Sequence, residues 1–204
     1  MRICLVRHGQ TDWNAEGRWQ GHEDIPLNEL GREQAQFAAL LLAKYEWAKV
    51  FSSPLQRALE TAQIIATAID ISKKPKILDD LRERHMGEAS GLTKEERQEK
   101  FPDGVVSDAE DLEEVAERGI TALNTIAEEH SEENVIVVAH GGIIRAILRS
   151  LLGDKCDENL KMENLSMSML EKSGDAFEVV FYNKTASEIK NESSIGDVEK
   201  LNKP

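Results

Sequence analysis

The chain has 204 residues, of which 40% are hydrophobic and 31% charged, a balance that suits one soluble globular domain with a full-sized core. A formal net charge of −13 disfavours nucleic acid and anionic membranes as partners, and no apolar run is long enough to span a bilayer. The N-terminus shows no secretory signal, and Cys4 and Cys156 are isolated, so we expect a cytoplasmic protein with reduced cysteines.

Hydrophobic spacing predicts strands and helices that follow one another along most of the chain. The predicted strands are residues 3–6, 50–51, 75–78, 135–139, 165–170 and 177–181. The predicted helices are residues 29–44, a helix beginning at Ser53-Pro54, residues 94–99, a long helix after a capping box at 107–110, and residues 143–152. Since a turn at 173–175 joins the last two strands, we predict an α/β fold, a three-layer α/β/α sandwich with a central mixed, mostly parallel sheet.

We expect residues 1–183 to form a single domain, because no change in composition divides them. Residues 10–26 are predicted to form a loop, and the weak pattern over residues 84–108 predicts a small cap beside the site. Residues 184–204 are polar and mixed in charge, which is typical of a flexible or loosely docked tail. The oligomeric state stays open between monomer and homodimer.

Two predicted buried strands each end in a histidine followed by glycine, at Arg7-His8-Gly9 and at His140-Gly141-Gly142. Open α/β sheets bind ligands at the C-terminal ends of their strands, so we expect the two histidines to meet there. Arg57, in the first turn of the second helix, can reach the same edge. Two arginines and two histidines predict a site for a dianion, with a phosphoryl group as the obvious candidate. The N–H groups of Gly141 and Gly142 would favour the same anion.

A neutral imidazole can act as a nucleophile, so His8 is the candidate to attack phosphorus and form a phosphohistidine that water then releases. The leaving oxygen needs a proton, for which Glu83 is the candidate acid. Other nearby carboxylates, Asp79, Asp80 and Glu88, compete for that role. Arginines beside the histidines and the absence of HxH or HExxH spacing disfavour a metal site. We therefore expect no metal and no cofactor, and a small-molecule phosphate ester as partner.

These segments resemble the motifs of the histidine phosphatase superfamily, also called the phosphoglycerate mutase-like family. The resemblance rests on Arg7-His8-Gly9 with Thr11 and Asn14, on the run from Ser52 to Ala62, and on His140-Gly141-Gly142. It extends from residue 2 to about residue 182, and therefore covers nearly the whole chain. The family needs no metal, so the resemblance implies a metal-independent enzyme.

The resemblance also implies roles for individual residues. His8 would be the phosphorylated nucleophile, and Glu83 falls where the family places its proton donor. The phosphate pocket would be completed by Arg7, Arg57 and His140, with a further hydrogen bond from Asn14. Gln20 and Gly21 match a loop that lines the substrate side in relatives. Residues 87–91 depart from the family pattern, because the tryptophan and glutamate common after the acid are missing.

We predict a phosphatase, because the short segment between Glu83 and His140 leaves room for only a modest cap over the phosphoenzyme. A phosphoglycerate mutase, and a catalytically silent phosphate-binding or regulatory protein, remain alternatives. Asn14 could serve only as a turn or cap residue, and Trp13 and Trp19 could line the pocket or pack in the core. The three other histidines, which lack supporting neighbours in the sequence, are predicted to lie at the surface; they are His22, His85 and His130.

Overall fold

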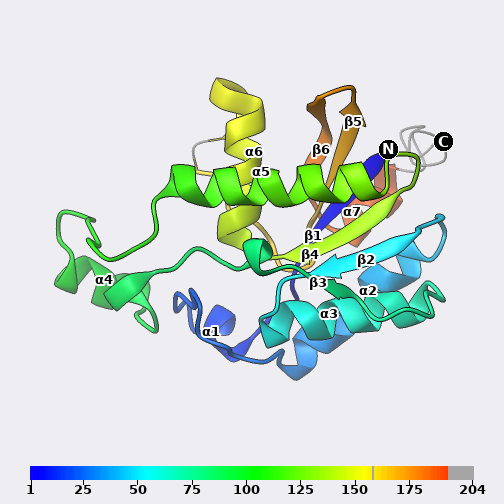
Figure 1. Cartoon of the computed structure of the whole chain (residues 1–204). Helices are drawn as coiled ribbons and strands as arrows, with labels where there is room; N and C mark the ends of the chain where they lie inside the picture. Colours follow the sequence, from blue (N-terminus) through cyan, green and yellow to red (C-terminus); the bar gives the residue numbers. More distant parts are fainter. Residues whose placement is uncertain (158, 193–204) are drawn as a thin grey trace.

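The computed structural model describes residues 1–157 and 159–192. Its strands form one six-stranded sheet in the order β3-β2-β4-β1-β5-β6 (Figure 1). The strands are β1 (Arg2–Arg7), β2 (Lys49–Ser52), β3 (Lys76–Ile77), β4 (Val135–Ala139), β5 (Met167–Ser173) and β6 (Ala176–Lys184). Strands β1 to β4 pair in parallel, whereas β5 is antiparallel to both β1 and β6. The predicted mixed, mostly parallel sheet is confirmed.

Helices cover both faces of the sheet, so the predicted three-layer sandwich is also confirmed (Figure 1). The helices are α1 (Asp12–Ala15), α2 (Glu29–Leu42), α3 (Gln56–Ala68), α4 (Lys94–Lys100), α5 (Leu112–Glu129), α6 (Gly141–Leu152) and α7 (Ala186–Glu192). Helices α5 and α6 pack on one face, and α2, α3 and α7 on the other. None of the helices in the described ranges is long and apolar enough to cross a membrane.

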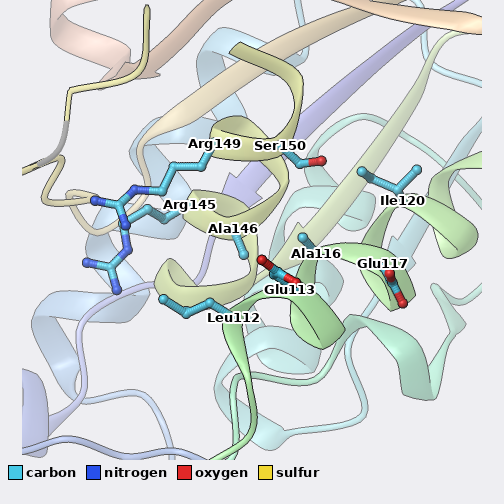
Figure 2. A pocket seen from close by; sticks show the side chains of 9 residues that line it. All are labelled: Leu112, Glu113, Ala116, Glu117, Ile120, Arg145, Ala146, Arg149 and Ser150. Carbon is cyan, nitrogen blue, oxygen red and sulfur yellow. The ribbon is translucent and has the colours of Figure 1, made fainter. Parts of the chain in front are cut away.

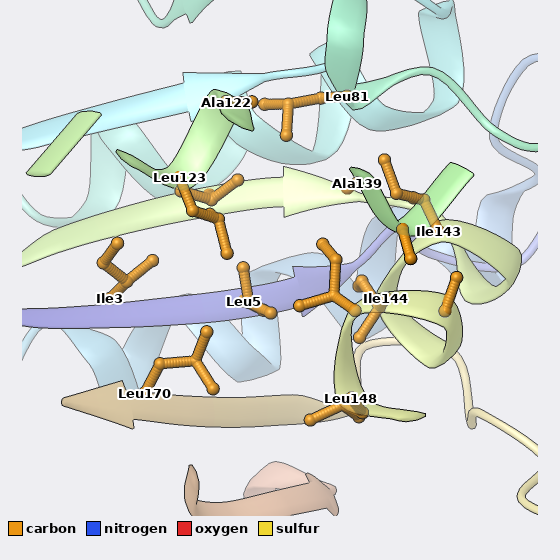
Figure 3. Packing of buried hydrophobic residues seen from close by; sticks show 14 of the residues in the cluster. Ile3, Leu5, Leu81, Ala122, Leu123, Ala139, Ile143, Ile144, Leu148 and Leu170 are labelled. Carbon is orange, nitrogen blue, oxygen red and sulfur yellow. The ribbon is translucent and has the colours of Figure 1, made fainter. Parts of the chain in front are cut away.

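The two-residue period of the central strands explains why both faces of the sheet are buried. In β1, Ile3 and Leu5 join the cluster beneath α5 and α6, while Cys4 and Val6 join the opposite cluster. Strand β4 is buried along its whole length. Figure 3 shows the first cluster, in which Leu123 of α5 and Ile144 of α6 lie over the sheet. Continuous apolar strands are therefore what a sheet with two helical layers requires.

The register of the central strands places the two histidine motifs side by side. Arg7 of β1 pairs with Ala139 of β4, and the backbone N–H of His8 donates to the carbonyl of Ala139 at 3.0 Å. On the other side of β4, the N–H of Ser53 donates to the carbonyl of Val138 at 3.0 Å. The ends of β1, β2 and β4 therefore meet at one edge of the sheet.

Several predicted helix starts were wrong by a few residues. Helix α5 begins after Asp111, whose side chain accepts from the N–H of Glu113, and no helix begins at the predicted capping box over 107–110. Helix α3 begins at Gln56, and α6 begins at Gly141 with His140 as its N-cap. The predicted loop over 10–26 contains the short helix α1. These local starts depend on side-chain contacts that hydrophobic spacing does not report.

The C-terminal prediction was wrong over residues 184–192. Strand β6 ends at Lys184, and α7 follows with Ala186 and Ile189 buried in the cluster beside α2. A mostly polar helix can still dock through two apolar residues on one face. The rest of the predicted tail, residues 193–204, lies outside the described residues.

Candidate active site

His8 follows β1 directly and is almost completely buried, with 2% of its surface exposed. Its Nδ1 lies 2.6 Å from the carbonyl oxygen of Gly9. Because a carbonyl only accepts, Nδ1 carries the proton, and the neutral ring keeps its lone pair on Nε2. Gly9 is required here, since a Cβ at this position would lie 2.4 Å from the carbonyl oxygen of Gly31 in α2. The chain therefore presents His8 in one fixed tautomer.

His140 lies beside His8, with 5.2 Å between the ring centroids, and is fully buried. Its Nε2 lies 2.7 Å from the hydroxyl oxygen of Ser53, and its Nδ1 has no hydrogen-bond partner among the described residues. The predicted helix start lies at Ser53, but the Ser53 hydroxyl accepts a 3.3 Å hydrogen bond from the N–H of Leu55 and contacts His140. Ser53 thus orients the second imidazole.

Two buried arginines flank the histidines. Arg7 donates through Nη1 to the carbonyl of Met162, and Arg57 donates to the carbonyls of Gly21 at 2.8 Å and Glu23 at 2.7 Å. The Nε groups of Arg7 and Arg57 are buried without a hydrogen-bond partner in the described part of the chain. Backbone carbonyls therefore hold each guanidinium in place, while neither forms an ion pair within the described residues.

This positive surrounding determines the charge of the histidines. Burial, and then the charges of Arg57 and Arg7, lower the pKa of His8 well below 6.5, although its bond to Gly9 acts in the opposite direction. Burial followed by Arg57 lowers the pKa of His140 well below 6.5 in the same way. Burial lowers the pKa of Arg57 to about 10, so its guanidinium keeps its proton at pH 7. The site therefore combines neutral imidazoles with charged guanidinium groups at pH 7.

Glu83 lies at the N-terminus of α6 and lines the same cleft as His8. Its carboxylate accepts from the N–H groups of Gly142 at 3.0 Å, Ile143 at 3.1 Å and Arg84 at 2.8 Å. The expectation that the N–H of Gly142 is directed at a bound phosphoryl group was therefore wrong, because Glu83 occupies that donor. The free N–H groups of a helix N-terminus attract acceptor oxygens, and here the protein supplies them from the Glu83 side chain.

Arg118 of α5 holds the segment that carries Glu83. It donates to the carbonyls of Asp80 and Arg82, both at 2.7 Å, and of Glu83 at 3.1 Å. Its guanidinium also forms a two-pronged ion pair with Glu110, at 2.6 and 3.0 Å. Hydrophobic spacing did not predict this role of Arg118, because a charged residue within a long helix is usually expected to lie on its solvent-exposed face.

The competing carboxylates do not share this position. Asp79, Asp80 and Glu88 are exposed, and Glu88 forms an ion pair with Lys100 at 2.9 Å.

His22 and His85 are exposed as predicted, but they do have neighbours: their rings lie 5.1 Å apart, and His22 Nε2 donates to the carbonyl of Glu83 at 2.7 Å.

The predicted substrate loop lines the same cleft as His8. Asn14 takes part in the cap of α1, as considered from the sequence, because its Oδ1 accepts from the backbone N–H of the N-cap residue Thr11 at 3.2 Å. Asn14 also lines the cleft. Gln20 is buried and accepts from the Thr11 hydroxyl at 3.0 Å. Gly21 adopts a φ of +51° and presents its carbonyl to Arg57. Asn164, which the sequence analysis missed, donates to the carbonyl of His8 at 3.1 Å.

These residues surround a cleft of about 440 Å³. Its lining includes eight of the nine predicted site residues: Arg7, His8, Asn14, Gln20, Gly21, Arg57, Glu83 and Gly141. The ninth, His140, is buried and does not belong to the described lining. Trp19 lines the cleft, which resolves one of the tryptophan alternatives, and Arg97 of α4 stacks on its ring at 3.9 Å. No group of three or more potential metal ligands occurs among residues 1–157 and 159–192.

The chain matches the model of the Histidine phosphatase superfamily (branch 1) over residues 3–185. It is 34% identical to the protein named uncharacterized phosphatase PhoE of Bacillus subtilis (strain 168) over 183 residues, which are 89% of this chain and 93% of that relative. It is also 41% identical to a metal-independent phosphoserine phosphatase of Arabidopsis thaliana over 160 residues, covering 71% of this chain and 66% of the relative.

Solved structures show the same likeness. Mycobacterial glucosyl-3-phosphoglycerate phosphatase in complex with VO3 superposes with a TM-score of 0.82 at 29% identity, over 90% of this chain and 99% of that one. A phosphoserine phosphatase mutant from Entamoeba histolytica in complex with phosphoserine gives a TM-score of 0.78 at 25% identity, over 91% and 98% of the two chains.

Proposed function

This chain belongs to the histidine phosphatase superfamily (branch 1), and on that premise we propose that it is a metal-independent phosphatase that hydrolyses small phosphomonoesters through phosphorylated His8. One observation carries the proposal. Three of the five buried side-chain atoms that lack a hydrogen-bond partner in the described residues belong to this site: Arg7 Nε, Arg57 Nε and His140 Nδ1. Buried polar atoms are rarely unsatisfied, so this grouping is expected where a ligand supplies the acceptors. A phosphoryl group with its charged oxygens has that chemistry.

The proposed reaction has two steps. In the first, Nε2 of His8 attacks phosphorus, the bond between phosphorus and the ester oxygen breaks, and Glu83 gives a proton to the leaving oxygen. Arg7 and Arg57 offset the charge on the transferred oxygens. In the second step, the Glu83 carboxylate takes a proton from water, which attacks phosphorus and breaks its bond to Nε2. Inorganic phosphate and free His8 result.

The fixed tautomer supports His8 rather than His140 as the nucleophile. The carbonyl of Gly9 holds the proton on Nδ1 of His8, so Nε2 is available for attack, and His8 lines the cleft. His140 is fully buried and directs its own Nε2 to Ser53. Because both rings are neutral at pH 7, no proton has to be removed before the attack.

The test is the turnover of p-nitrophenyl phosphate in EDTA by the parent chain and by His8→Ala. We expect release of phosphate by the parent and a loss of about 10³-fold or more in the variant, as for removal of other covalent nucleophiles. Rapid quenching should trap a phosphoryl group on the parent that survives base and is released by acid. Absence of both phosphate release and phosphoenzyme would contradict the proposal.

Assays of phosphoglycerate conversion and of phosphate binding separate the alternatives. Interconversion of 2- and 3-phosphoglycerate faster than release of phosphate would identify a mutase. Phosphate binding without turnover of any ester would identify a silent binding protein. The short segment 84–108 supports hydrolysis, because a small cap leaves water access to the phosphoenzyme.

A further inference from the structure

A tight turn over residues 20–23, here called the Gly21 turn, lies between the phosphate-binding half of the site and the half that carries Glu83. The N–H of Glu23 donates to the carbonyl of Gln20 at 2.9 Å, and Gly21 inside the turn has a φ of +51°. A Cβ at position 21 would lie 3.1 Å from the backbone nitrogen of Met86, so the turn packs closely against the cap. This packing leaves the turn little freedom to move.

The main chain of the Gly21 turn holds the phosphate-binding half. The carbonyls of Gly21 and Glu23 accept from the two terminal nitrogens of Arg57, at 2.8 and 2.7 Å. Neither bond involves the side chain of His22, which lies between these two residues in the sequence. A substitution at position 22 can therefore leave the contacts of Arg57 intact.

The side chain of His22 holds the other half. Its Nε2 donates to the backbone carbonyl of Glu83 at 2.7 Å, and the same carbonyl accepts from Nη2 of Arg118 at 3.1 Å. A carbonyl oxygen has two lone pairs, so these two donors satisfy it completely. His22 does not belong to the described lining of the cleft, whereas Glu83 does. Any effect of His22 on the reaction is therefore exerted through Glu83.

The two donors to this carbonyl are supported in different ways. Arg118 belongs to α5, and Figure 2 shows Ala116 of that helix beside Ala146 of α6. Helix packing thus ties Arg118 to the helix whose N-terminus binds the Glu83 carboxylate. The bond from His22 is the one hydrogen bond, within the described ranges, that joins the Gly21 turn to residues 79–84. It therefore links the proton-donor segment directly to the turn that holds Arg57.

We propose that His22 is a positioning residue for proton transfer, which keeps the Glu83 carboxylate in a fixed place relative to the phosphate held by Arg57. This inference rests on the proposed phosphatase function. An acid must lie within hydrogen-bond reach of the leaving oxygen, and a small displacement of the acid slows the transfer. When one of its two donors is lost, the peptide group of Glu83 can rotate, and the side chain moves with it.

The first test follows the position of Glu83 without any turnover. Its carboxylate accepts from the N–H groups of Gly142 and Ile143, so hydrogen exchange of these two amides, measured by NMR, reports whether the carboxylate stays in place. We expect exchange about 3- to 10-fold faster in His22→Leu than in the parent, the effect of one lost hydrogen bond. His22→Gln, whose amide can donate to the same carbonyl, should restore the parent rates.

The second test compares ethyl phosphate, which has a poor leaving group, with p-nitrophenyl phosphate, which has a good one. His22→Leu should lower kcat/KM about 3- to 10-fold for ethyl phosphate and less than about 2-fold for p-nitrophenyl phosphate, because only the alkoxide needs the proton. The inhibition constant of inorganic phosphate should stay at the parent value, since the carbonyls of Gly21 and Glu23 still hold Arg57.

His85→Leu is the matched control, because it removes a second exposed imidazole whose ring lies 5.1 Å from that of His22. The Nδ1 of His85 lies 3.2 Å from the carbonyl oxygen of Asp108, and its ring makes no hydrogen bond to Glu83 within the described residues. This control should match the parent in both tests.

Unchanged exchange of Gly142 and Ile143 in His22→Leu, or equal losses for the two esters, would overturn the inference. Such a result would leave the proposed phosphatase activity intact, because turnover of p-nitrophenyl phosphate by the parent tests that activity separately. Conversely, a chain that hydrolyses no ester would still show faster exchange in His22→Leu if His22 positions Glu83.

Discussion

The carboxylate of Glu83 lies 3.0 Å from the backbone nitrogen of Gly142, whose N–H it accepts as a hydrogen bond. Gly142 is the second residue of α6, and the N-cap of that helix is His140. One helix N-terminus therefore fixes both the proposed acid and the second histidine. A Cβ at position 142 would lie 2.3 Å from Oε1 of Glu83, so only glycine leaves room for the carboxylate.

Gly142→Ala should displace Glu83 while leaving His8 in place. We expect a loss of about 10- to 100-fold in kcat/KM for alkyl phosphates, whose leaving oxygens need a proton, and a smaller loss for p-nitrophenyl phosphate. Gly141→Ala is the matched control, because its Cβ would approach Arg7 Nε at 3.2 Å and not Glu83. Equal losses for the two classes of ester in Gly142→Ala would show that the variant disturbs phosphate binding instead.

Glu83→Gln should impair the same step without a steric change. The amide cannot supply a proton. We therefore expect the substitution to lower kcat/KM about 10²-fold more for esters with poor leaving groups than for esters with good ones. The measurement is the dependence of kcat/KM on leaving-group pKa across a series of aryl and alkyl phosphates. An unchanged slope would assign proton donation to another group.

Arg118→Gln should loosen the Glu83 segment, because the carbonyls of Asp80 and Arg82 lose their donor. Unsatisfied carbonyls should lower the free energy of unfolding by about 1–3 kcal/mol, measured by urea denaturation. Arg118 is a positioning residue here, so kcat/KM for alkyl phosphates should fall more than that for aryl phosphates. In a chain that already carries Glu83→Gln, adding Arg118→Gln should change the ratio of kcat/KM for alkyl and aryl phosphates little further. Additive effects in the double variant would indicate a purely structural role.

The stability of the protein should fall as the pH drops below 6.5. Burial and the neighbouring arginines depress the pKa values of His8 and His140, so the unfolded chain binds protons that the folded chain excludes. The contribution of the two histidines to the free energy of unfolding is complete above the pKa of histidine in the unfolded chain. It decreases toward lower pH, by up to about 1.4 kcal/mol per pH unit for each histidine. Urea denaturation at pH 7 and pH 5.5 measures this loss.

His8→Gln provides the comparison for that measurement, because glutamine does not titrate. Its unfolding free energy should depend less steeply on pH over the same interval. The same depressed pKa predicts that kcat/KM of the parent does not decline near pH 6.5, where an ordinary histidine titrates, but only well below that pH, where His8 takes up a proton. A steeper pH dependence of stability in His8→Gln would contradict the assignment.

The amino-acid pattern by itself determined the layers of the fold. Strands β1 and β4 are apolar on both faces, which indicates a sheet covered by helices on both sides, and each is followed by His-Gly. Since parallel strands align their C-terminal ends, His8 and His140 were expected to meet, and their rings lie 5.2 Å apart. Short-range patterns of this kind can be read from sequence because they follow from backbone geometry alone.

Only the tertiary structure showed that the carboxylate of Glu83, and not that of a competing residue, accepts from the N–H of Gly142, so that this donor is not free for phosphate. Only the tertiary structure brought Arg118 from α5 to the Glu83 carbonyl and turned Arg145 of α6 toward the cleft. Long charged side chains have many rotamers, and their partners lie far away in sequence. Their contacts are therefore decided by how helices pack on the sheet, and that packing is not encoded in any local pattern.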